Sequence, residues 1–262
     1  MNHSFSAPAK KSLGQHFLAD RYYIDRIVQA VDPRAGQHLV EIGPGQGAIT
    51  FPLLRKHGAL TVIEFDRDLI APLTNAAAPI GALSIIHRDV LSVDFTALAD
   101  GTPIRLVGNL PYNISSPILF HALDHAGAVA DMHFMLQKEV VDRMAAGPGS
   151  KVYGRLSVML QAYCEVTALF VVPPGAFRPP PKVDSAVVRL VPRDPATVQI
   201  RDRRRFADVV RAGFGQRRKT LRNALSNVCE PAHFEAAQVR PDARAEQLEV
   251  ADFIRLANVE PA

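Results

Sequence analysis

The sequence contains no tryptophan and only two cysteines, Cys164 and Cys229, among its 262 residues. The cysteines lie far apart and form no CxxC pair, which argues against a disulfide framework. No apolar run approaches the ~18 residues of a membrane helix, and residues 1–13 lack the apolar stretch of a signal peptide. The HExxH and P-loop motifs are also absent. We therefore expect a cytoplasmic protein that uses no metal and contacts no membrane.

The composition is ordinary for a folded protein. Hydrophobic residues make up 48% of the chain, which argues against disorder. The length permits one large domain or two smaller ones. The net charge is +4 and the pI about 9.2, which is compatible with an anionic partner without requiring one. The position of the basic residues is therefore more informative than their number.

Short apolar runs alternate with stretches of helical spacing in the first part of the chain. Residues 20–31 have the spacing of a helix, with Asp20 as its candidate cap. Strands are predicted over residues 38–42, 60–65, 83–87, 104–107 and 133–136, and helices near residues 47–57, 67–76, 116–125 and 139–146. This alternation predicts an α/β fold with a mainly parallel sheet.

The later part of the chain has a different pattern. Residues 156–165 are predicted to be helical, and residues 167–172 and 185–191 to form a hairpin at the sheet edge, joined by a proline-rich segment. Beyond Pro192 the sequence predicts only helices with basic faces. We therefore expect a catalytic domain over residues 1–192 and a small all-helical RNA-binding domain over residues 193–262.

A glycine-rich segment over residues 41–47 follows the first of these strands and opens a helix. Its G-x-G-x-G spacing is a poor match to the G-x-G-x-x-G pyrophosphate cradle, but Gly43 and Gly45 would allow close backbone approach to a ligand. Glu64 ends the next strand, at a position where acids bind ribose hydroxyls. Asp89 follows the third strand, where a carboxylate can accept a hydrogen bond from an adenine amine.

The simpler explanation of this pattern is that the glycines only make turns and the acids only cap helices. Three such features in order, each at the carboxyl end of a strand, favour a nucleoside cofactor, because ligands bind at that edge of open α/β sheets. The arrangement resembles the Rossmann-like S-adenosylmethionine-dependent methyltransferases. Since that fold serves many chemistries, the reaction has to be inferred from the site.

The segment Asn109-Leu110-Pro111-Tyr112 is the most informative stretch of the chain. The exocyclic amine of adenine is a poor nucleophile, because its lone pair is spread into the ring, and acceptors for both N–H groups would localise that pair. The Asn109 side-chain oxygen and the Leu110 carbonyl are candidates for these acceptors. Pro111 has a fixed φ that would stiffen the turn, and Tyr112 is suited to stack on the base.

Several motifs occur in order along most of the chain. They are Gly14 to Leu18, Glu41 to Thr50, Val62 to Glu64, Asp89, Gly108 to Ser115, Met135 to Val140, Tyr153 to Val158, Phe177 to Ser185 and Gln216 to Leu221. This set resembles the ribosomal RNA adenine dimethyltransferases, in particular the bacterial small-subunit enzymes. Members of that family commonly have Asn where this chain has His16.

The resemblance implies transfer of methyl groups from S-adenosylmethionine to two adjacent adenosines. Each N6 amine would receive two methyls, in the 3′-terminal hairpin of 16S ribosomal RNA, late in small-subunit biogenesis. By position, His16 and Leu18 would flank the cofactor, and Gly43 would lie under its amino-acid part. Asn109 would stand where the cofactor and the target base meet. We expect the enzyme to act as a monomer.

Phe177 lies in the proline-rich segment, and the resemblance implies that it packs against the flipped adenine, opposite Tyr112. Base–aromatic stacking is typically worth ~1–3 kcal/mol. The alternative is a core residue under a loop.

Basic residues concentrate after the predicted domain boundary. Residues 201–222 contain nine Arg and Lys residues and only two acids, Asp202 and Asp208. The local net charge, nine minus two, is therefore +7. This density suits phosphate contacts, whereas a charge run is usually a solvated helix face. We predict that RNA is bound by Arg217, Arg218, Lys219 and Arg222.

Three other functions remain open from the sequence. A large-subunit adenine methyltransferase of the antibiotic-resistance type would share the cofactor loop and the Asn109 motif, although residues 177–185 and 216–221 favour the small-subunit enzyme. A non-catalytic nucleic-acid-binding factor would not need the complete cofactor set. A protein methyltransferase acting on amide nitrogens would explain the Asn109 motif but not the basic helices.

Overall fold

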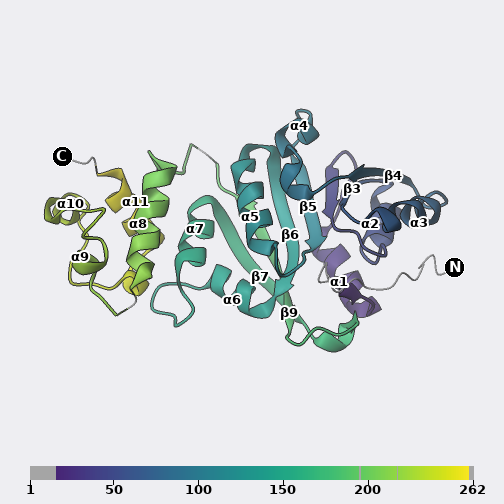
Figure 1. Ribbon diagram of the computed structural model, residues 1–262. Coiled ribbons are helices and arrows are strands. Elements are labelled where there is room, and N and C mark those ends of the chain that lie inside the picture. Colours follow the sequence, from purple (N-terminus) through teal and green to yellow (C-terminus); the bar gives the residue numbers. More distant parts are fainter. Residues whose placement is uncertain (1–15, 195, 217, 260–262) are drawn as a thin grey trace. The chain divides into compact units, whose positions relative to one another are not determined.

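The protein, described here by a computed structural model over residues 16–194, 196–216 and 218–259, folds as two compact units (Figure 1). One unit comprises the chain up to residue 141 together with residues 167–192, and the other comprises residues 142–166 together with the chain from residue 193 onward. The chain passes from the first unit to the second between residues 192 and 193, where the sequence predicts the domain boundary. Residues 142–166 group with the C-terminal helices, whereas the sequence analysis placed them in the first domain. The division into a catalytic and an RNA-binding domain remains a prediction.

A seven-stranded sheet in the order β4-β3-β2-β5-β6-β9-β7 organises the first unit (Figure 1). The strands are β2 (His38–Ile42), β3 (Ala59–Glu64), β4 (Ala82–His87), β5 (Ile104–Asn109), β6 (Val129–Gln137), β7 (Cys164–Val172) and β9 (Ser185–Pro192). The five strands from β4 to β6 are parallel, and β9 runs antiparallel to β6. The predicted Rossmann-like α/β fold is confirmed.

Helices flank the parallel strands: most lie between two of these strands along the chain, the first precedes β2 and the last follows β6. They are α1 (Arg21–Val31), α2 (Thr50–His57), α3 (Arg67–Ala77), α4 (Phe95–Ala99), α5 (Ser115–Asp124) and α6 (Lys138–Ala145). Asp20, Asp66 and Asp94 cap α1, α3 and α4 by accepting backbone N–H groups of the first turn, which satisfies donors that a helix start leaves free. The cap predicted at Asp20 is confirmed, whereas α4 and the short 3₁₀ turn before it (Val90–Ser92) were not predicted.

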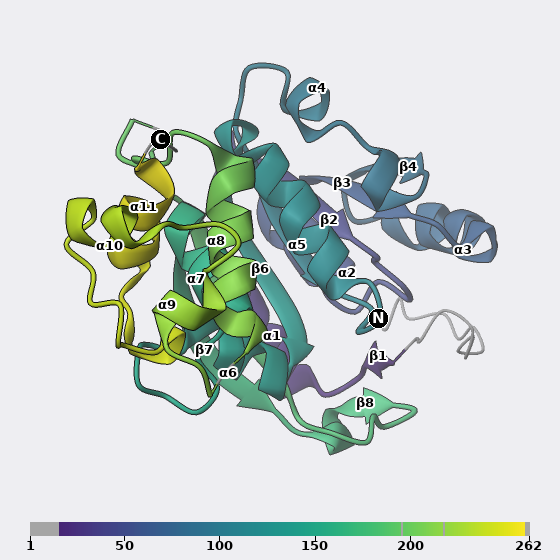
Figure 2. The same cartoon turned by 60° about the vertical axis from the view of Figure 1, so that its left-hand side comes forward.

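A two-stranded antiparallel sheet joins β1 (Phe17–Leu18) to β8 (Phe177–Arg178) (Figure 2). Phe17 lies opposite Arg178, and Leu18 opposite Phe177. The Ala176 carbonyl also accepts hydrogen bonds from the N–H groups of Ala19 and Asp20. These contacts bring the start of the described chain against the proline-rich segment, far away in sequence. Strands of two residues have no detectable alternation, so the sequence analysis missed this pairing.

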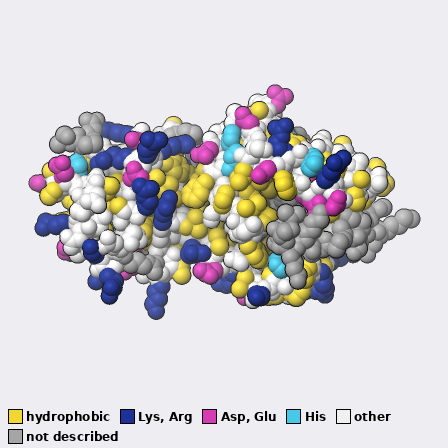
Figure 3. All heavy atoms as spheres, in the orientation of Figure 1, with side chains coloured by type: hydrophobic (Ala, Val, Ile, Leu, Met, Phe, Trp, Pro, Cys, Tyr) yellow, Lys and Arg dark blue, Asp and Glu magenta, His cyan; other side chains and the backbone are white. Residues whose placement is uncertain are grey.

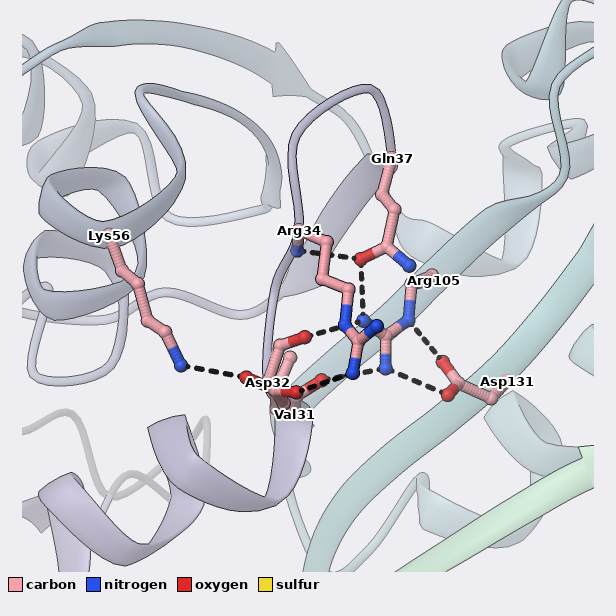
Figure 4. Close-up of polar contacts among 7 residues, drawn as sticks. All are labelled: Val31, Asp32, Arg34, Gln37, Lys56, Arg105 and Asp131. Atoms are coloured by element: carbon pink, nitrogen blue, oxygen red, sulfur yellow. Dashed lines mark hydrogen bonds and ion pairs between the residues drawn. The ribbon is translucent and has the colours of Figure 1, made fainter.

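A buried ion pair holds the amino ends of β5 and β6 to the end of α1 (Figure 4). The Arg105 guanidinium donates to both carboxylate oxygens of Asp131, each at 2.8 Å, to the Val31 carbonyl at 2.7 Å and to the Gln37 side-chain oxygen at 2.7 Å. The side chains of Arg105 and Asp131 are 10% and 8% exposed. A bidentate pair of this kind fixes the register between neighbouring strands.

Replacing Arg105 with methionine is expected to destabilise the protein by about 3–5 kcal/mol, because the buried Asp131 carboxylate loses its closest donors. Urea unfolding measures this loss. The matched change Lys56→Met removes an exposed pair with Asp32 and is expected to have a much smaller effect, because solvent screens an exposed pair. Equal losses for the two variants would show that the buried network is not a principal support of the sheet.

The second unit is mainly helical. Its helices are α7 (Arg155–Tyr163), α8 (Arg203–Gly215), α9 (Leu221–Ala224), α10 (Pro231–Ala236) and α11 (Val250–Asn258). Phe214 stacks on Phe253 with ring centroids 5.5 Å apart, and the Tyr153 hydroxyl donates to the Leu248 carbonyl at 2.9 Å. The predicted series of helices is confirmed. In the described part of the chain, no helix has both the length and the apolar character needed to cross a membrane.

Candidate active site

A cavity of about 280 Å³ opens at the carboxyl ends of β2, β3 and β5, next to the turn that follows β4. Its size is close to the lower end of the range for small-molecule sites. Its wall includes the predicted cofactor residues His16, Leu18, Gly43, Gly45, Glu64, Asp89 and Asn109, together with Leu110, Pro111 and Tyr112. The fold therefore gathers all but one of the predicted cofactor and catalytic residues around one cavity, and the exception is Phe177.

The glycine segment forms the tight turn that connects β2 to α2. Gly43, Gly45 and Gly47 have φ values of 66°, 55° and 81°, a region that side-chain-bearing residues adopt at a cost of roughly 1–2 kcal/mol. A Cβ added at Gly43 would meet no atom of the described part of the chain within 4 Å. The backbone at Gly43 therefore leaves open space beside the cavity, as close approach of a ligand requires.

Gly47 is needed for packing as well as for its φ. A Cβ there would overlap the ring of the buried Phe51, so Gly47→Ala is expected to cost about 2–5 kcal/mol from backbone strain and overpacking together. Gly101 has the same φ of 81° and open space around it, so Gly101→Ala is expected to show only the strain, about 1–2 kcal/mol. Thermal or urea unfolding compares them, and a Gly47 variant no less stable than the Gly101 variant would contradict the packing argument.

Three acids line the cavity, and their environments differ. Glu64 is 6% exposed, and its carboxylate accepts the N–H groups of Asp66 at 2.7 Å and Gly45 at 3.3 Å. Burial raises the pKa of Glu64, while these N–H groups lower it. Asp89 is exposed and accepts the Leu91 N–H at 3.0 Å. Glu41 is 2% exposed, and its Oε2 has no hydrogen-bond partner among the described residues.

The orientation of the Asn109 amide follows from its hydrogen bond. Its Nδ2 donates to the His16 backbone carbonyl at 3.0 Å. A carbonyl oxygen can only accept, so the NH₂ group must face His16 and the Oδ1 atom must face the other way. The Leu110 N–H donates to the Met135 carbonyl, and no hydrogen bond to the Leu110 carbonyl occurs within the described residues. Two oxygen acceptors are thus presented at the end of β5.

Tyr112 is held from two sides. Its hydroxyl forms a 2.8 Å hydrogen bond with Ser185 at the start of β9, and its ring lies against that of His16, with centroids 5.9 Å apart and planes 26° apart. The His16 Nδ1 lies 3.0 Å from the Pro179 carbonyl. As a hydrogen bond, this contact needs a proton on Nδ1, because a carbonyl oxygen only accepts. His16 therefore links the N-terminal segment, the Asn109 motif and the proline-rich segment.

Phe177 is where the structure departs from the prediction. Its side chain is 0% exposed and belongs to the hydrophobic core, and it does not line the cavity. The pairing of β8 with β1 places it opposite Leu18, which draws the ring into the core instead of towards a base. The structure thus matches the alternative of a core residue under a loop.

Several cavity residues were not predicted as site residues. They include Glu41, Gln46, Phe65, Arg88, Asn113 and Ile114. Phe65 is 63% exposed although it is a large apolar side chain. Its position directly after Glu64 at a strand end was a usable signal, since exposed aromatics beside a predicted ligand residue suggest contact with that ligand.

The basic surface lies on the second unit, where Figure 3 shows Lys and Arg side chains on the part that holds α8 and α11. Arg218, Lys219 and Arg222 are exposed, whereas Arg217 lies outside the described residues. Some of the nine cations have structural partners. Arg205 donates to the Ala257 carbonyl, Arg211 pairs with Asp208, and Arg201 contacts Asn258. The exposed cations after α8 are therefore better candidates for phosphate contacts.

The chain is similar to solved methyltransferases along most of its length. A dimethyladenosine transferase from Plasmodium falciparum aligns with a TM-score of 0.80 and 25% identity, over 92% of this chain and 96% of that one. The 23S rRNA methyltransferase ErmE aligns with a TM-score of 0.71 and 25% identity, over 92% and 98%. With the cavity at the strand ends, these similarities define an S-adenosylmethionine-dependent methyltransferase.

The sequence comparison narrows this class. Residues 7–260 match the family described as ribosomal RNA adenine dimethylase, and the chain belongs to that family. Two relatives named ribosomal RNA small subunit methyltransferase A cover the full length of both sequences. The protein from Xanthomonas oryzae pv. oryzae strain PXO99A is 97% identical, and that from Xanthomonas campestris pv. campestris strain 8004 is 94% identical.

The cavity fits the cofactor of this class. The open space at Gly43 suits close backbone approach, and the buried Oε2 of Glu41 is an acceptor that no donor of the described residues satisfies. Among the described residues, no cluster of three His, Cys, Asp or Glu side chains is arranged to hold a metal ion, and the expectation of a reaction without metal remains a prediction.

Proposed function

We propose that this protein dimethylates the N6 amines of two adjacent adenosines in the 3′-terminal hairpin of 16S ribosomal RNA, in the cytoplasm, during late small-subunit biogenesis. The observation that carries the proposal is the orientation of the Asn109 amide, which points an acceptor oxygen away from His16 at the edge of the cofactor cavity. The family and the full-length relatives support the substrate. We further propose that the enzyme acts as a monomer, without metal and without membrane contact.

The cofactor would be held by residues from four loops of the cavity. Gly43 and Gly45 would lie under its amino-acid part, Glu64 would bind the ribose hydroxyls, and Asp89 the adenine amine. His16 and Leu18 would flank it through their backbone. Bound in this way, S-adenosylmethionine supplies a methyl group on a positively charged sulfur.

The target amine would be held by Asn109 Oδ1 and the Leu110 carbonyl, each accepting one N–H group. Both acceptors lie on a turn that is fixed by the Asn109–His16 and Leu110–Met135 hydrogen bonds, so they are oriented before the base arrives. Positioning of this kind can contribute ~7–11 kcal/mol. A methylated amine loses its proton readily, so the chain needs no dedicated general base.

The target adenine must leave its stack, which costs a few kcal/mol. Tyr112 would offset part of that cost by stacking on the base, with its ring fixed through Ser185. Since Phe177 is fully buried, we assign the stacking to Tyr112 alone. Arg217, Arg218, Lys219 and Arg222 would bind backbone phosphates of the same RNA.

Incubation with labelled S-adenosylmethionine and unmethylated ribosomal subunits tests the proposal. We expect label on the small subunit only, and primer extension stops at two adjacent adenosines near the 3′ end of 16S RNA. Label on large-subunit RNA would favour the resistance-type alternative, and label on protein would favour a protein methyltransferase. The absence of transfer to any of them would favour a non-catalytic factor.

A further inference from the structure

The cavity contains a buried acid that the proposed mechanism does not use. Glu41 is the second-last residue of β2, just before the turn that begins at Gly43, and it lines the cavity and is 2% exposed. Its Oε2 has no hydrogen-bond partner among the described residues. A negatively charged carboxylate oxygen that is buried without a donor or a counter-charge is disfavoured. The charged form of Glu41 would therefore be stabilised by a cation bound in the cavity.

We propose that Glu41 holds a proton in the empty cavity and releases it when the positively charged methyl donor binds, so that the site distinguishes the donor from its uncharged by-product. The inference rests on the proposed function, because it concerns the cofactor of that reaction. Glu41 would thus be a positioning residue whose negative charge stabilises the bound donor.

The neighbours of Glu41 explain why it, and not Glu64, keeps the proton. Burial raises the pKa of Glu41, a hydrogen bond from the Thr50 hydroxyl lowers it, and the nearby Glu64 carboxylate raises it, so that the pKa is about 8. Glu64 has backbone donors on both oxygens, which stabilise its charged form. Glu41 has an oxygen without a donor. Of two interacting acids, the one with fewer donors retains the proton.

The elements packed around Glu41 bring both uncharged and titratable side chains to the cavity. β5 presents the apolar Val107 in register with Glu41, and α2 presents the uncharged Thr50. The titratable groups on the remaining walls are Glu64, Asp89, Arg88, His16 and Tyr112, and Asp66 follows Glu64. Among these groups, the Glu64 carboxylate raises the pKa of Glu41 by charge repulsion. A cation bound beside these acids would favour the charged form of Glu41.

The proton balance of one turnover follows. An opposite charge within ~4–6 Å lowers a carboxyl pKa by about 1–3. A donor sulfonium bound that close would bring the pKa of Glu41 from about 8 to neutrality or below, and up to one proton would leave. During transfer the carbon–sulfur bond breaks, its electron pair stays on sulfur, the amine forms the new bond, and the amine loses one proton. The sulfur is then uncharged, Glu41 binds a proton again, and the by-product loses its charge-matched partner.

Calorimetric titration without RNA tests this inference. Binding is measured near pH 7 in two buffers of different ionisation enthalpy, which yields the number of protons released. We expect S-adenosylmethionine to release about one more proton than S-adenosylhomocysteine. The two ligands share their amino and carboxyl groups, so those contributions cancel. Glu41→Gln should abolish the difference and weaken donor binding about tenfold or more relative to by-product binding. The exposed Glu165→Gln should keep the wild-type difference.

The outcomes separate this inference from the proposed function. Equal proton release with both ligands, or a difference that persists in Glu41→Gln, overturns the role of Glu41 while RNA methylation stands. Binding of neither ligand overturns both. Failure to methylate RNA despite the expected proton release overturns only the proposed function.

A second measurement needs no ligand. The folded protein holds the Glu41 proton between about pH 4.5 and 8, whereas the unfolded chain does not, so this group makes stability fall as pH rises through that window. Glu41→Gln should remove the fall. We expect the variant to match the wild type in Tm near pH 5 and to exceed it near pH 9. A variant that melts below the wild type at both pH values would contradict a neutral Glu41 in the empty cavity.

Discussion

Asn109→Ala is expected to lower the rate of methyl transfer by about 10²–10³-fold, the loss typical for removal of one preorganised polar group at a reacting centre. The substitution removes the Oδ1 acceptor and also the hydrogen bond to the His16 carbonyl. Single-turnover methylation of small subunits measures the rate. Cofactor affinity, measured by calorimetry, should fall less, because the glycine segment, Glu64 and Asp89 remain in place.

Asn75→Ala provides a matched control, since Asn75 is an exposed residue of α3 outside the cavity. It should methylate at the wild-type rate. Near-normal methylation by Asn109→Ala would refute the assignment of the amine acceptor. A loss of cofactor affinity as large as the loss of rate would show that Asn109 serves the donor and not the base.

Neutralising Arg218, Lys219 and Arg222 together is expected to weaken RNA binding about 10²-fold at ~0.1 M salt. Each phosphate contact contributes about 0.7–0.9 to the slope of log K against log salt, so the slope should flatten by about 2–3. The three side chains are exposed on the second unit. Filter binding of a 3′-terminal 16S fragment over a salt series measures both quantities.

A control with the same change in net charge uses Arg21, Arg55 and Arg67, three exposed cations of the first unit. Their replacement by glutamine should leave the slope nearly unchanged. If the two triple variants flatten the slope equally, the RNA is attracted by total charge alone. If the first variant keeps the wild-type slope, the phosphate contacts lie elsewhere.

The parts of the site that the sequence predicted are those fixed by strand ends. Glu64 and Asn109 end β3 and β5, and Asp89 lies just after β4, and parallel strands bring their carboxyl ends to one edge of the sheet. The glycine segment was recognisable because a strand, a tight turn and a helix follow one another directly. These features are local, so pattern and spacing suffice to place them.

The parts that the sequence did not predict depend on contacts between distant segments. Phe177 is buried because β8 pairs with β1, about 160 residues earlier in the chain, and strands of two residues have no periodicity to detect. The partition of residues 142–166 into the second unit has no marker in composition. The buried state of Glu41 depends on how β2, β3 and α2 pack together, which its position in the glycine motif does not reveal.

The most direct test of the central claim is mass spectrometry of the 3′-terminal fragment of 16S RNA. The RNA is taken from unmethylated small subunits before and after incubation with the enzyme and S-adenosylmethionine. We expect two adjacent adenosines to become dimethylated at N6, with no other residue changed. Fragments that stay unmethylated, or that gain methyl groups on another base or another atom, would contradict the account.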